Sequence, residues 1–343
     1  MPAQFLTWYQ GLTDGLFGSL VLFVLGAFLL IKGGDWFVDG AVGMAKRFHL
    51  PEIIIGATVV SIGTTLPEVM VSVTAAVHSH GGIAFGSAIG SIICNTALIA
   101  ALTVAIRPSS INRKNLIIPV LFFFLSASVY ATAAYIFGRF DRWLGIVLLL
   151  LFGVYMALTI YKGSRHTGQE QQEETIETPA QPFFKDVILL AISAALIAVG
   201  ADMLEGSSVS LATLAGIPEE VVAVTIVALC TSLPELVTAV TALTKGHGAL
   251  SLGNVIGANI FNLVLVSGAA VTISPFVVPE GSQLLGCNAS LLIEIPLMFG
   301  VMALLTLPAL IRGKLSRWQG VTLLVIYAAF VTLQVLIACH VFS

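Results

Sequence analysis

Two stretches of this chain carry the same motif at an offset of 167 residues. Residues 63–68 read Gly-Thr-Thr-Leu-Pro-Glu, and residues 230–235 read Cys-Thr-Ser-Leu-Pro-Glu. Each copy places a carboxylate directly after a proline inside a long apolar run, where an acid at a helix centre costs roughly 2.5 kcal/mol or more in lipid. Two such acids at matched positions indicate a site that requires negative charge, most simply a cation site.

The repeat extends well beyond the motif. Without a gap, identical residues recur at the same offset from the pair Asp35 and Asp202 to the pair Asn95 and Asn262, over 61 residues. Five predicted helices separate the two copies, so the second copy enters the membrane from the opposite side. Inverted repeats with interrupted helices are typical of secondary transporters, whose substrate site lies near the membrane midplane.

Long apolar runs place the chain in a membrane. It is 57% hydrophobic and only 10% charged, whereas soluble domains carry about 25% charged residues. A spanning helix needs about 20 apolar residues. The sequence therefore predicts ten spans, which are 16–43, 51–78, 82–106, 115–138, 142–162, 186–212, 218–244, 248–273, 284–311 and 317–340.

We expect an all-α, polytopic membrane protein of two inverted five-helix halves. The first half covers 1–162 and contains the repeat motif at about 51–106. The second half covers 186–343 and contains the motif at about 218–273. An acidic, solvated linker of residues 163–185 joins the halves. The motif prolines predict breaks in the second and seventh helices, because proline removes a helical hydrogen bond.

Charge asymmetry predicts the orientation in the membrane. Twelve lysines and arginines fall in the connections after helices 1, 3, 5, 7 and 9, against only Arg139 and Arg142 on the other side. This bias places the linker in the cytoplasm and both termini outside. The start of the chain lacks the basic residues of a cleavable signal peptide, so we expect the first helix to be retained. No basic patch favours nucleic acid.

Each motif offers oxygen ligands within about one helical turn. Thr64 and Glu68 are four residues apart and share a helix face, as do Thr231 and Glu235. Backbone carbonyls freed by the proline are tolerated at membrane depth only where they line a cavity or are buried in protein. Carboxylates, hydroxyls and carbonyls together suit hard cations such as calcium or sodium.

The helices that follow each motif add a second layer. Their Gly-x-x-x-Gly faces, at 86–90 and 253–257, favour close helix approach. Ser91 and Asn95 follow in the first copy, and Ala258 and Asn262 follow in the second. Each of these two pairs has i, i+4 spacing and so points in one direction. The asparagines are neutral, which leaves two net charges in the core.

Two carboxylates predict how transport is coupled. At a separation of about 5 Å they repel by roughly 3 kcal/mol at an effective dielectric near 20. One divalent ion, several monovalent ions or protons would relieve this repulsion, so these cations compete. A site that must be filled by one class of cation or another is an antiporter site.

The paired motifs resemble those of the sodium/calcium exchanger family, in the calcium:cation antiporter superfamily, as a bacterial or archaeal member. The resemblance implies ten helices, exchange of calcium or another divalent cation against sodium or protons in a plasma membrane, no cofactor and no obligate protein partner. Asn262 stands where potassium-dependent relatives have aspartate, which argues against potassium transport.

Residue by residue, the resemblance also implies roles for the motif positions. Glu68 and Glu235 would be the divalent ligands, helped by the carbonyls of Thr64 and Thr231. Asn95 and Asn262 would face the centre. Flanking sodium positions would be lined by Thr65, Ser91, Ser232 and the carbonyl of Ala258.

Other interpretations remain open at this stage. The two glutamates could be buried structural acids, and the asparagines could join helices without touching an ion. Asp35 is close to Lys32 in sequence and could pair with it, while Glu294 could be a proton relay or a structural acid. Proton-coupled exchange and a cation channel are alternative functions. An enzyme is disfavoured because the motifs contain no histidine and no nucleophile grouping.

Overall fold

The computed structural model describes residues 15–48, 51–108, 110–166, 183–214, 232–279, 283–284 and 287–338. Nearly all of these residues are helical. Within them, eight helices are long and apolar enough to cross a membrane, and a bent helix pair would make a ninth span. The predicted all-α, polytopic membrane fold is confirmed. The described part of the predicted seventh helix is a shorter apolar helix, Leu233–Thr244, and its residues 218–231 lie outside the described residues.

The predicted spans of the first half match its elements closely. In chain order these are α2 (Leu16–Phe48), α3 (Glu52–Ile55), η1 (Gly56–Val60), α4 (Ser61–Val77), α5 (Gly81–Cys94), η2 (Asn95–Ala100), α6 (Ala101–Ile106), α7 (Arg113–Thr132), η3 (Ala133–Phe137), β1 (Arg139–Phe140) and α8 (Arg142–His166), where η marks π-helical turns. The first helix runs five residues beyond its predicted end at position 43, through Lys46 and Arg47.

The second half follows a similar order. Its elements are α9 (Phe183–Leu214), α12 (Leu233–Thr244), α13 (Gly248–Phe261), η5 (Asn262–Val266), α14 (Ser267–Ile273), β2 (Phe276–Val277), β3 (Gln283–Leu284), β4 (Cys287–Asn288), η6 (Ser290–Glu294), α15 (Ile295–Arg312) and α16 (Arg317–Ala338). The strands form only two short antiparallel pairs, β1 with β2 and β3 with β4.

The predicted start of the ninth helix at residue 284 is wrong. Residues 283–284 and 287–288 form the β3–β4 pair, and the helical turns begin at about Ser290. Asn288 explains the change, because its side-chain oxygen accepts a hydrogen bond from the Ser290 amide at 2.9 Å. Its side-chain nitrogen also donates to the Pro279 carbonyl. An asparagine whose side chain accepts a hydrogen bond from a free backbone N–H favours the start of a helix at that point. The helix therefore begins after Asn288, and the residues before it remain extended.

The second predicted helix is broken at its motif, as expected from the proline. Its two parts, Glu52–Leu66 and Glu68–Val77, meet at an angle of 52°. The residue between them is a proline, which has no backbone N–H to continue the hydrogen-bond ladder. The break therefore comes directly before Glu68.

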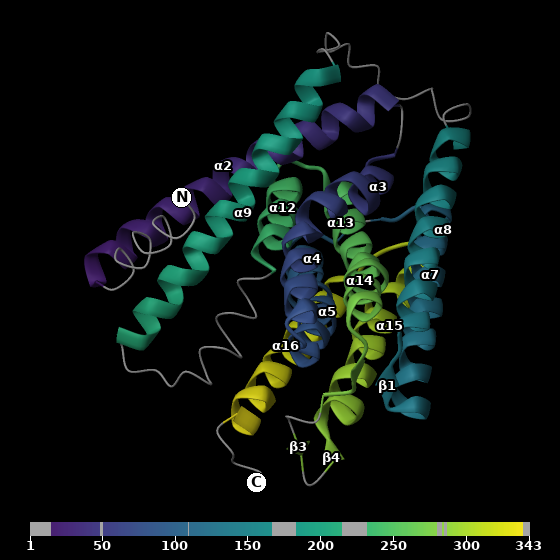
Figure 1. Cartoon of the computed structure of the whole chain (residues 1–343). Coiled ribbons are helices and arrows are strands. Elements are labelled where there is room, and N and C mark those ends of the chain that lie inside the picture. Colours follow the sequence, from purple (N-terminus) through teal and green to yellow (C-terminus); the bar gives the residue numbers. More distant parts are fainter. Residues whose placement is uncertain are drawn as a thin grey trace.

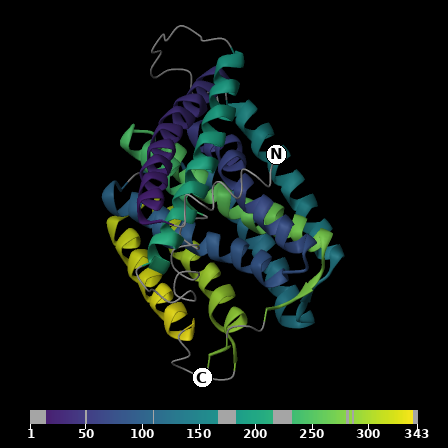
Figure 2. The same ribbon diagram turned by 60° about the vertical axis from the view of Figure 1, so that its left-hand side comes forward.

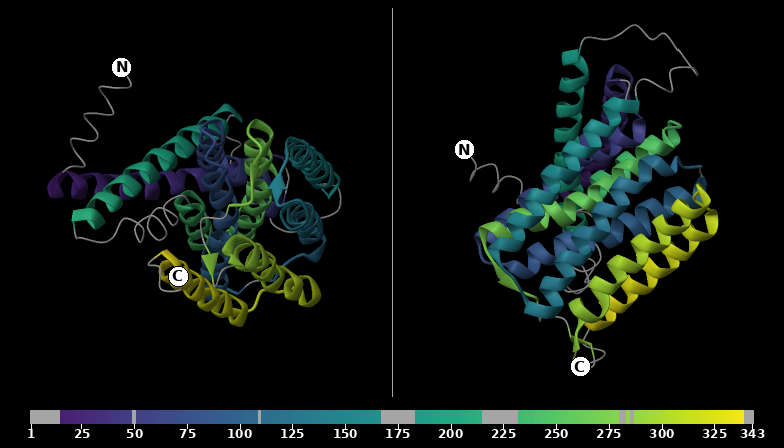
Figure 3. Two further views of the ribbon diagram at one scale, coloured as in Figure 1. Left: turned by 60° about the horizontal axis from the view of Figure 1, so that its bottom comes forward. Right: turned by 90° about the vertical axis from the view of Figure 1, so that its right-hand side faces the viewer.

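The helices α2 and α9 lie side by side and cross one side of the molecule obliquely (Figure 1). Figure 2 shows this pair brought forward, lying across the central helices. The end-on view in Figure 3 places α7 and α8 on one side, α15 and α16 on another, and α4, α5, α13 and α14 between them. The helix that carries the first motif and the helices that follow both motifs therefore lie in the middle of the molecule.

Close contacts between α2 and α9 are reciprocal. A Cβ added at Gly33 would meet the backbone of Ser193, and one added at Gly200 would meet the backbone of Gly26. Adding 167 to residue 33 gives 200, and subtracting 167 from residue 193 gives 26, so the second contact is the repeat image of the first. When a contact recurs between the matched residues with the two halves interchanged, the halves are related by an internal two-fold axis. These contacts therefore agree with an inverted repeat.

The helices that follow each motif also make contacts that recur with the two halves interchanged. The π-helical turns η2 and η5 begin at Asn95 and Asn262, which are matched residues of the repeat. Turn η2 contacts α13, and turn η5 contacts α5. A π-turn inserts one extra residue in a helical turn and is frequent at functional sites. Both halves therefore carry the same backbone irregularity at the same asparagine.

Backbones of the two halves touch where α3 and η1 meet α13. A Cβ at Gly253 would overlap the backbone of Ile53, and one at Gly257 would overlap the backbone of Ala57. A Cβ at Gly56 would meet the Asn254 backbone nitrogen at 2.8 Å. The Gly-x-x-x-Gly face of α13 therefore works as the sequence indicates, by letting two helices approach without intervening side chains. The same expectation is wrong for the face at 86–90, because a Cβ at Gly86 or Gly90 would meet no neighbouring helix of the described residues within 4 Å.

We predict that Gly253→Ala lowers the thermal stability of the detergent-solubilised protein, because over-packing typically costs about 1–3 kcal/mol. Gly300→Ala is the matched control. It also replaces a helical glycine, but no atom of the described residues lies within 4 Å of the added Cβ. Melting curves followed by intrinsic fluorescence compare the two variants, and equal melting temperatures would contradict the backbone contact.

Candidate functional site

The two motif carboxylates come from helices of opposite halves that contact each other. Glu68 follows the break that starts the second part of the bent helix, and Glu235 lies in the first turn of α12, with Pro234 beside it. An acid in a first helical turn faces free backbone N–H groups, which favour negative charge. Both prolines therefore place a carboxylate at the start of a helical segment.

Burial of the two carboxylates is complete. The residues Glu68 and Glu235 are 1% and 0% exposed. Their carboxyl groups lie close enough to interact with each other, and the hydroxyls of Thr64 and Thr65 lie beside Glu235. Within the described residues, none of the four carboxylate oxygens accepts a hydrogen bond from another side chain. Two adjacent buried acids without partners are rare in proteins, because an uncompensated charge in the interior is very costly.

Other predicted site residues share this lack of partners. Seven of the ten have buried side-chain oxygens or nitrogens with no hydrogen bond in the described part of the chain, namely Thr65, Glu68, Ser91, Asn95, Ser232, Glu235 and Asn262. Carboxylate, amide and hydroxyl oxygens are the ligands that hard cations take. No group of three or more His, Cys, Asp or Glu side chains gathers in those same segments, so the donor set combines two acids with neutral oxygens.

The three remaining predicted site residues, Thr64, Ala258 and Thr231, are not among these unpartnered side chains. The Thr64 hydroxyl donates to Asn254 at 3.3 Å. The carbonyl of Ala258 accepts the Asn262 backbone amide, and its second lone pair remains for another partner. Thr231 lies outside the described residues. The structure thus brings the glutamates, Thr64 and Thr65 together, and it leaves the ligand role of each residue as a prediction.

Sequence reasoning did not select Asn254 as a site residue. It is 1% exposed and bonds to residues of both halves, Thr64 on one side and Thr238 on the other. A signal was present in the sequence, because Asn254, Ala258 and Asn262 follow one another at i, i+4 spacing and share a face of the helix.

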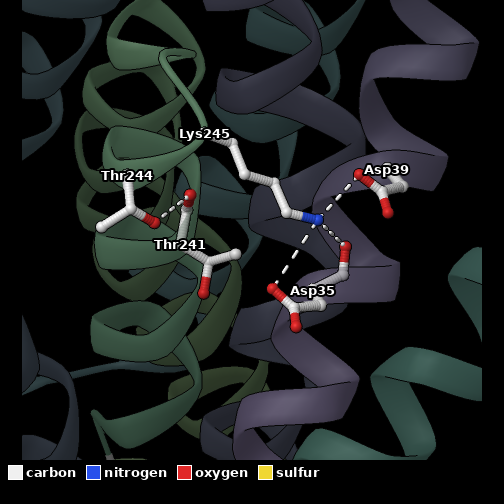
Figure 4. Close-up of polar contacts among 5 residues, drawn as sticks. All are labelled: Asp35, Asp39, Thr241, Thr244 and Lys245. Atoms are coloured by element: carbon white, nitrogen blue, oxygen red, sulfur yellow. Dashed lines mark hydrogen bonds and ion pairs between the residues drawn. The ribbon is translucent and has the colours of Figure 1, made fainter.

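Asp35 pairs with Lys245 and not with Lys32, the partner that the sequence suggested as one possibility. Figure 4 shows Lys245, at the end of α12, reaching between Asp35 and Asp39 of α2. Its Nζ lies 2.8 Å from Asp39 Oδ1 and 3.7 Å from Asp35 Oδ1, and it donates to the Asp35 carbonyl. Proximity in sequence did not decide the partner because helix packing brings Lys245 to this face. Asp202, the repeat match of Asp35, is exposed on α9.

A further ion pair and a histidine–carboxylate contact also join the two halves. Arg47 of α2 bonds to Asp186 of α9 at 3.2 Å, and His247 lies 2.7 Å from Glu52. Elsewhere, Glu294 accepts a hydrogen bond from Gln334 at 2.9 Å. This contact gives Glu294 a structural partner away from the two motif helices.

A helical membrane protein with facing carboxylates and unpaired neutral oxygens in its core belongs, by class, with the ion transporters. A family model described as sodium/calcium exchanger protein matches residues 18–161 and 185–336. The chain belongs to the sodium/calcium exchanger family, which is a family of membrane antiporters.

Relatives and solved structures agree with this assignment. The chain is 31% identical to the sodium/calcium exchanger MaX1 of Methanosarcina acetivorans, over 91% of this chain and 97% of the relative. It is 36% identical to the inner membrane protein YrbG of Escherichia coli, over 75% of this chain and 80% of the relative. A structure of the sodium–calcium exchanger NCX_Mj matches with a TM-score of 0.75 at 30% identity, covering 92% of this chain and 98% of the other.

We predict that calcium stabilises the purified protein through the carboxylate pair. A ligand at one hundred times its Kd adds about 2.7 kcal/mol to the stability of the form that binds it. Glu235→Gln should abolish the calcium-induced rise in melting temperature. Glu294→Gln, which changes a half-buried acid bonded to Gln334, should keep that rise. A full calcium response in Glu235→Gln would contradict a cation site at this pair.

Proposed function

We propose that this protein is a secondary-active antiporter that exchanges Ca²⁺, or another divalent cation, for Na⁺ at one central site. The observation that carries this proposal is the pair of adjacent, fully buried carboxylates, one from each half, which accept no hydrogen bond from the other described side chains. Membership of the sodium/calcium exchanger family supports the choice of ions.

Electrostatics explains why such a site exchanges cations instead of staying empty. Two neighbouring carboxylates repel by several kcal/mol when no cation separates them. A divalent ion between Glu68 and Glu235 cancels both charges. Several sodium ions do the same with help from neutral oxygens. The hydroxyls of Thr65, Ser91 and Ser232, which have no hydrogen bond within the described residues, are suited to that task. The site loaded with either kind of cation then has a lower free energy than the empty site.

Alternating access completes the proposed mechanism. The protein would change between inward- and outward-open states only when the site is loaded, and the inverted halves would give these states related structures. The pair α2 and α9 is the proposed moving part, because it packs tightly on itself through Gly26, Gly33 and Gly200 and lies across the other helices (Figure 2).

Proton-coupled exchange is the alternative function at the same site. Burial and mutual repulsion both favour protonated carboxylates, so protons could replace sodium. A channel would use the same acids as a selectivity filter, and single-channel currents would favour it.

We place the protein in a prokaryotic plasma membrane with residues 163–185 in the cytoplasm. A reporter that is fused after Ser343 and works only in the cytoplasm would reverse this orientation.

We predict that Glu68→Gln and Glu235→Gln each abolish calcium uptake while the protein stays folded, because either change halves the charge that holds a divalent ion. The measurement is calcium-45 uptake into proteoliposomes under an outward sodium gradient, with an outward proton gradient as the second arm. Uptake driven by protons alone would support the alternative, and undiminished uptake in either variant would exclude the proposed site.

Asn262→Asp should change the dependence of transport on monovalent ions. The substitution adds a third carboxylate to a buried position that is 0% exposed, so more positive charge is needed to fill the site. The test compares calcium-45 uptake at a series of sodium and potassium concentrations in the parent and the variant. Identical curves would show that Asn262 does not face the transported ions.

A further inference from the structure

Asn254 joins the two halves of the protein beside the carboxylate pair. It lies on α13, in the second half, and is 1% exposed. Its side-chain oxygen accepts a hydrogen bond from Thr64 Oγ1 at 3.3 Å, in the first half. Its side-chain nitrogen donates to Thr238 Oγ1 on α12 at 2.9 Å. One amide therefore connects three helices, two of which carry the motif glutamates.

The hydroxyl proton of Thr238 determines which atom donates and which accepts in this series of hydrogen bonds. Thr238 has one hydroxyl proton, which it donates to the Pro234 carbonyl at 2.8 Å, so its oxygen must accept from Asn254. The amide nitrogen of Asn254 therefore faces Thr238, and its oxygen faces Thr64. The nearby Ser61 hydroxyl does not compete for that oxygen, because it donates to the Gly56 carbonyl at the shorter distance of 2.8 Å, against 3.4 Å to Asn254 Oδ1.

The proton of Thr64 has two possible acceptors. One is Asn254, and the other is the Glu235 carboxylate, which lies beside Thr64. Among the described residues, the carboxylate oxygens of Glu235 accept no hydrogen bond. Thr64 is close enough to Glu235 to interact with it, but its contact with Asn254 at 3.3 Å is the one of the two that has hydrogen-bond geometry within the described residues. We therefore assign the proton to Asn254, which leaves the lone pairs of Thr64 available on the side of the carboxylate.

We propose that Asn254 is a positioning residue of the cation site, which holds the Thr64 hydroxyl proton so that Thr64 presents lone pairs to a cation bound at Glu235. This inference rests on the proposed function. Without Asn254, the Thr64 hydroxyl would turn and donate to Glu235. It would then cease to be a cation ligand, and it would also occupy a carboxylate lone pair that the cation needs.

The experiment is a double-mutant cycle of calcium-45 uptake kinetics in proteoliposomes. Asn254→Ser introduces the residue found at the matched position, Ser87, in the first half. In the parent we expect it to raise the KM for calcium about tenfold, the effect of losing roughly one hydrogen-bonded ligand, with Vmax changed less than about twofold. In a Thr64→Val background the same substitution should change KM by less than about twofold.

A second pair of variants keeps the test decisive if Asn254→Ser does not fold. Thr238→Val removes the hydroxyl that orients Asn254 and should also raise KM. Thr306→Val is the matched control, since Thr306 is likewise buried and donates to the carbonyl four residues earlier. It should leave KM unchanged. Thr64→Ser keeps a hydroxyl and should restore the sensitivity to Asn254→Ser.

Two results would overturn the proposal. One is an equal rise in KM from Asn254→Ser in the Thr64 and Thr64→Val backgrounds, which would mean that Asn254 only supports the fold. The other is an unchanged KM in Thr238→Val. The parent protein and Glu235→Gln are measured in parallel. Sodium-driven uptake that Glu235→Gln abolishes would leave the proposed function intact, whatever the outcome for Asn254.

Discussion

Two carboxyl groups buried side by side are the constraint on which this structure depends. Glu68 and Glu235 lie in the core, next to each other and without hydrogen-bond partners among the described residues. Desolvation and repulsion both oppose this arrangement, so the surrounding helices must hold it against its own tendency to separate. Under the proposed function, cations bound at the pair would relieve this repulsion and would add to the stability of the states that bind them.

Close backbone contact supplies the rigidity that this pair needs. Glycines at 56, 253 and 257 let η1 and α13 approach until their backbones touch. This contact joins the first half to the second through the segment of residues 53–57, which precedes the first motif. A membrane protein gains little from the hydrophobic effect between its helices, so shape and interhelical hydrogen bonds decide which helices associate. The chain of hydrogen bonds through Asn254 adds such polar contacts at the same interface.

The two halves are alike in backbone and different in chemistry. Matched π-turns begin at Asn95 and Asn262, and the α2–α9 contacts exchange under the repeat. At the position of Asn254, however, the first half has Ser87. A serine side chain is shorter than that of asparagine and carries one donor proton instead of two, and Ser87 Oγ makes no hydrogen bond within the described residues. The pseudo-symmetric scaffold can therefore carry an asymmetric ligand set.

The sequence by itself determined the membrane class, most helix boundaries, the break before Glu68 and the residues to expect at the site, because these follow from apolar length, proline chemistry and an ungapped repeat. It did not determine the partner of Lys245, the strand pair before Ser290 or the role of Asn254. Those features depend on which surfaces meet when helices far apart in the chain pack together. Local pattern records which face a residue occupies, and only tertiary packing decides what that face touches.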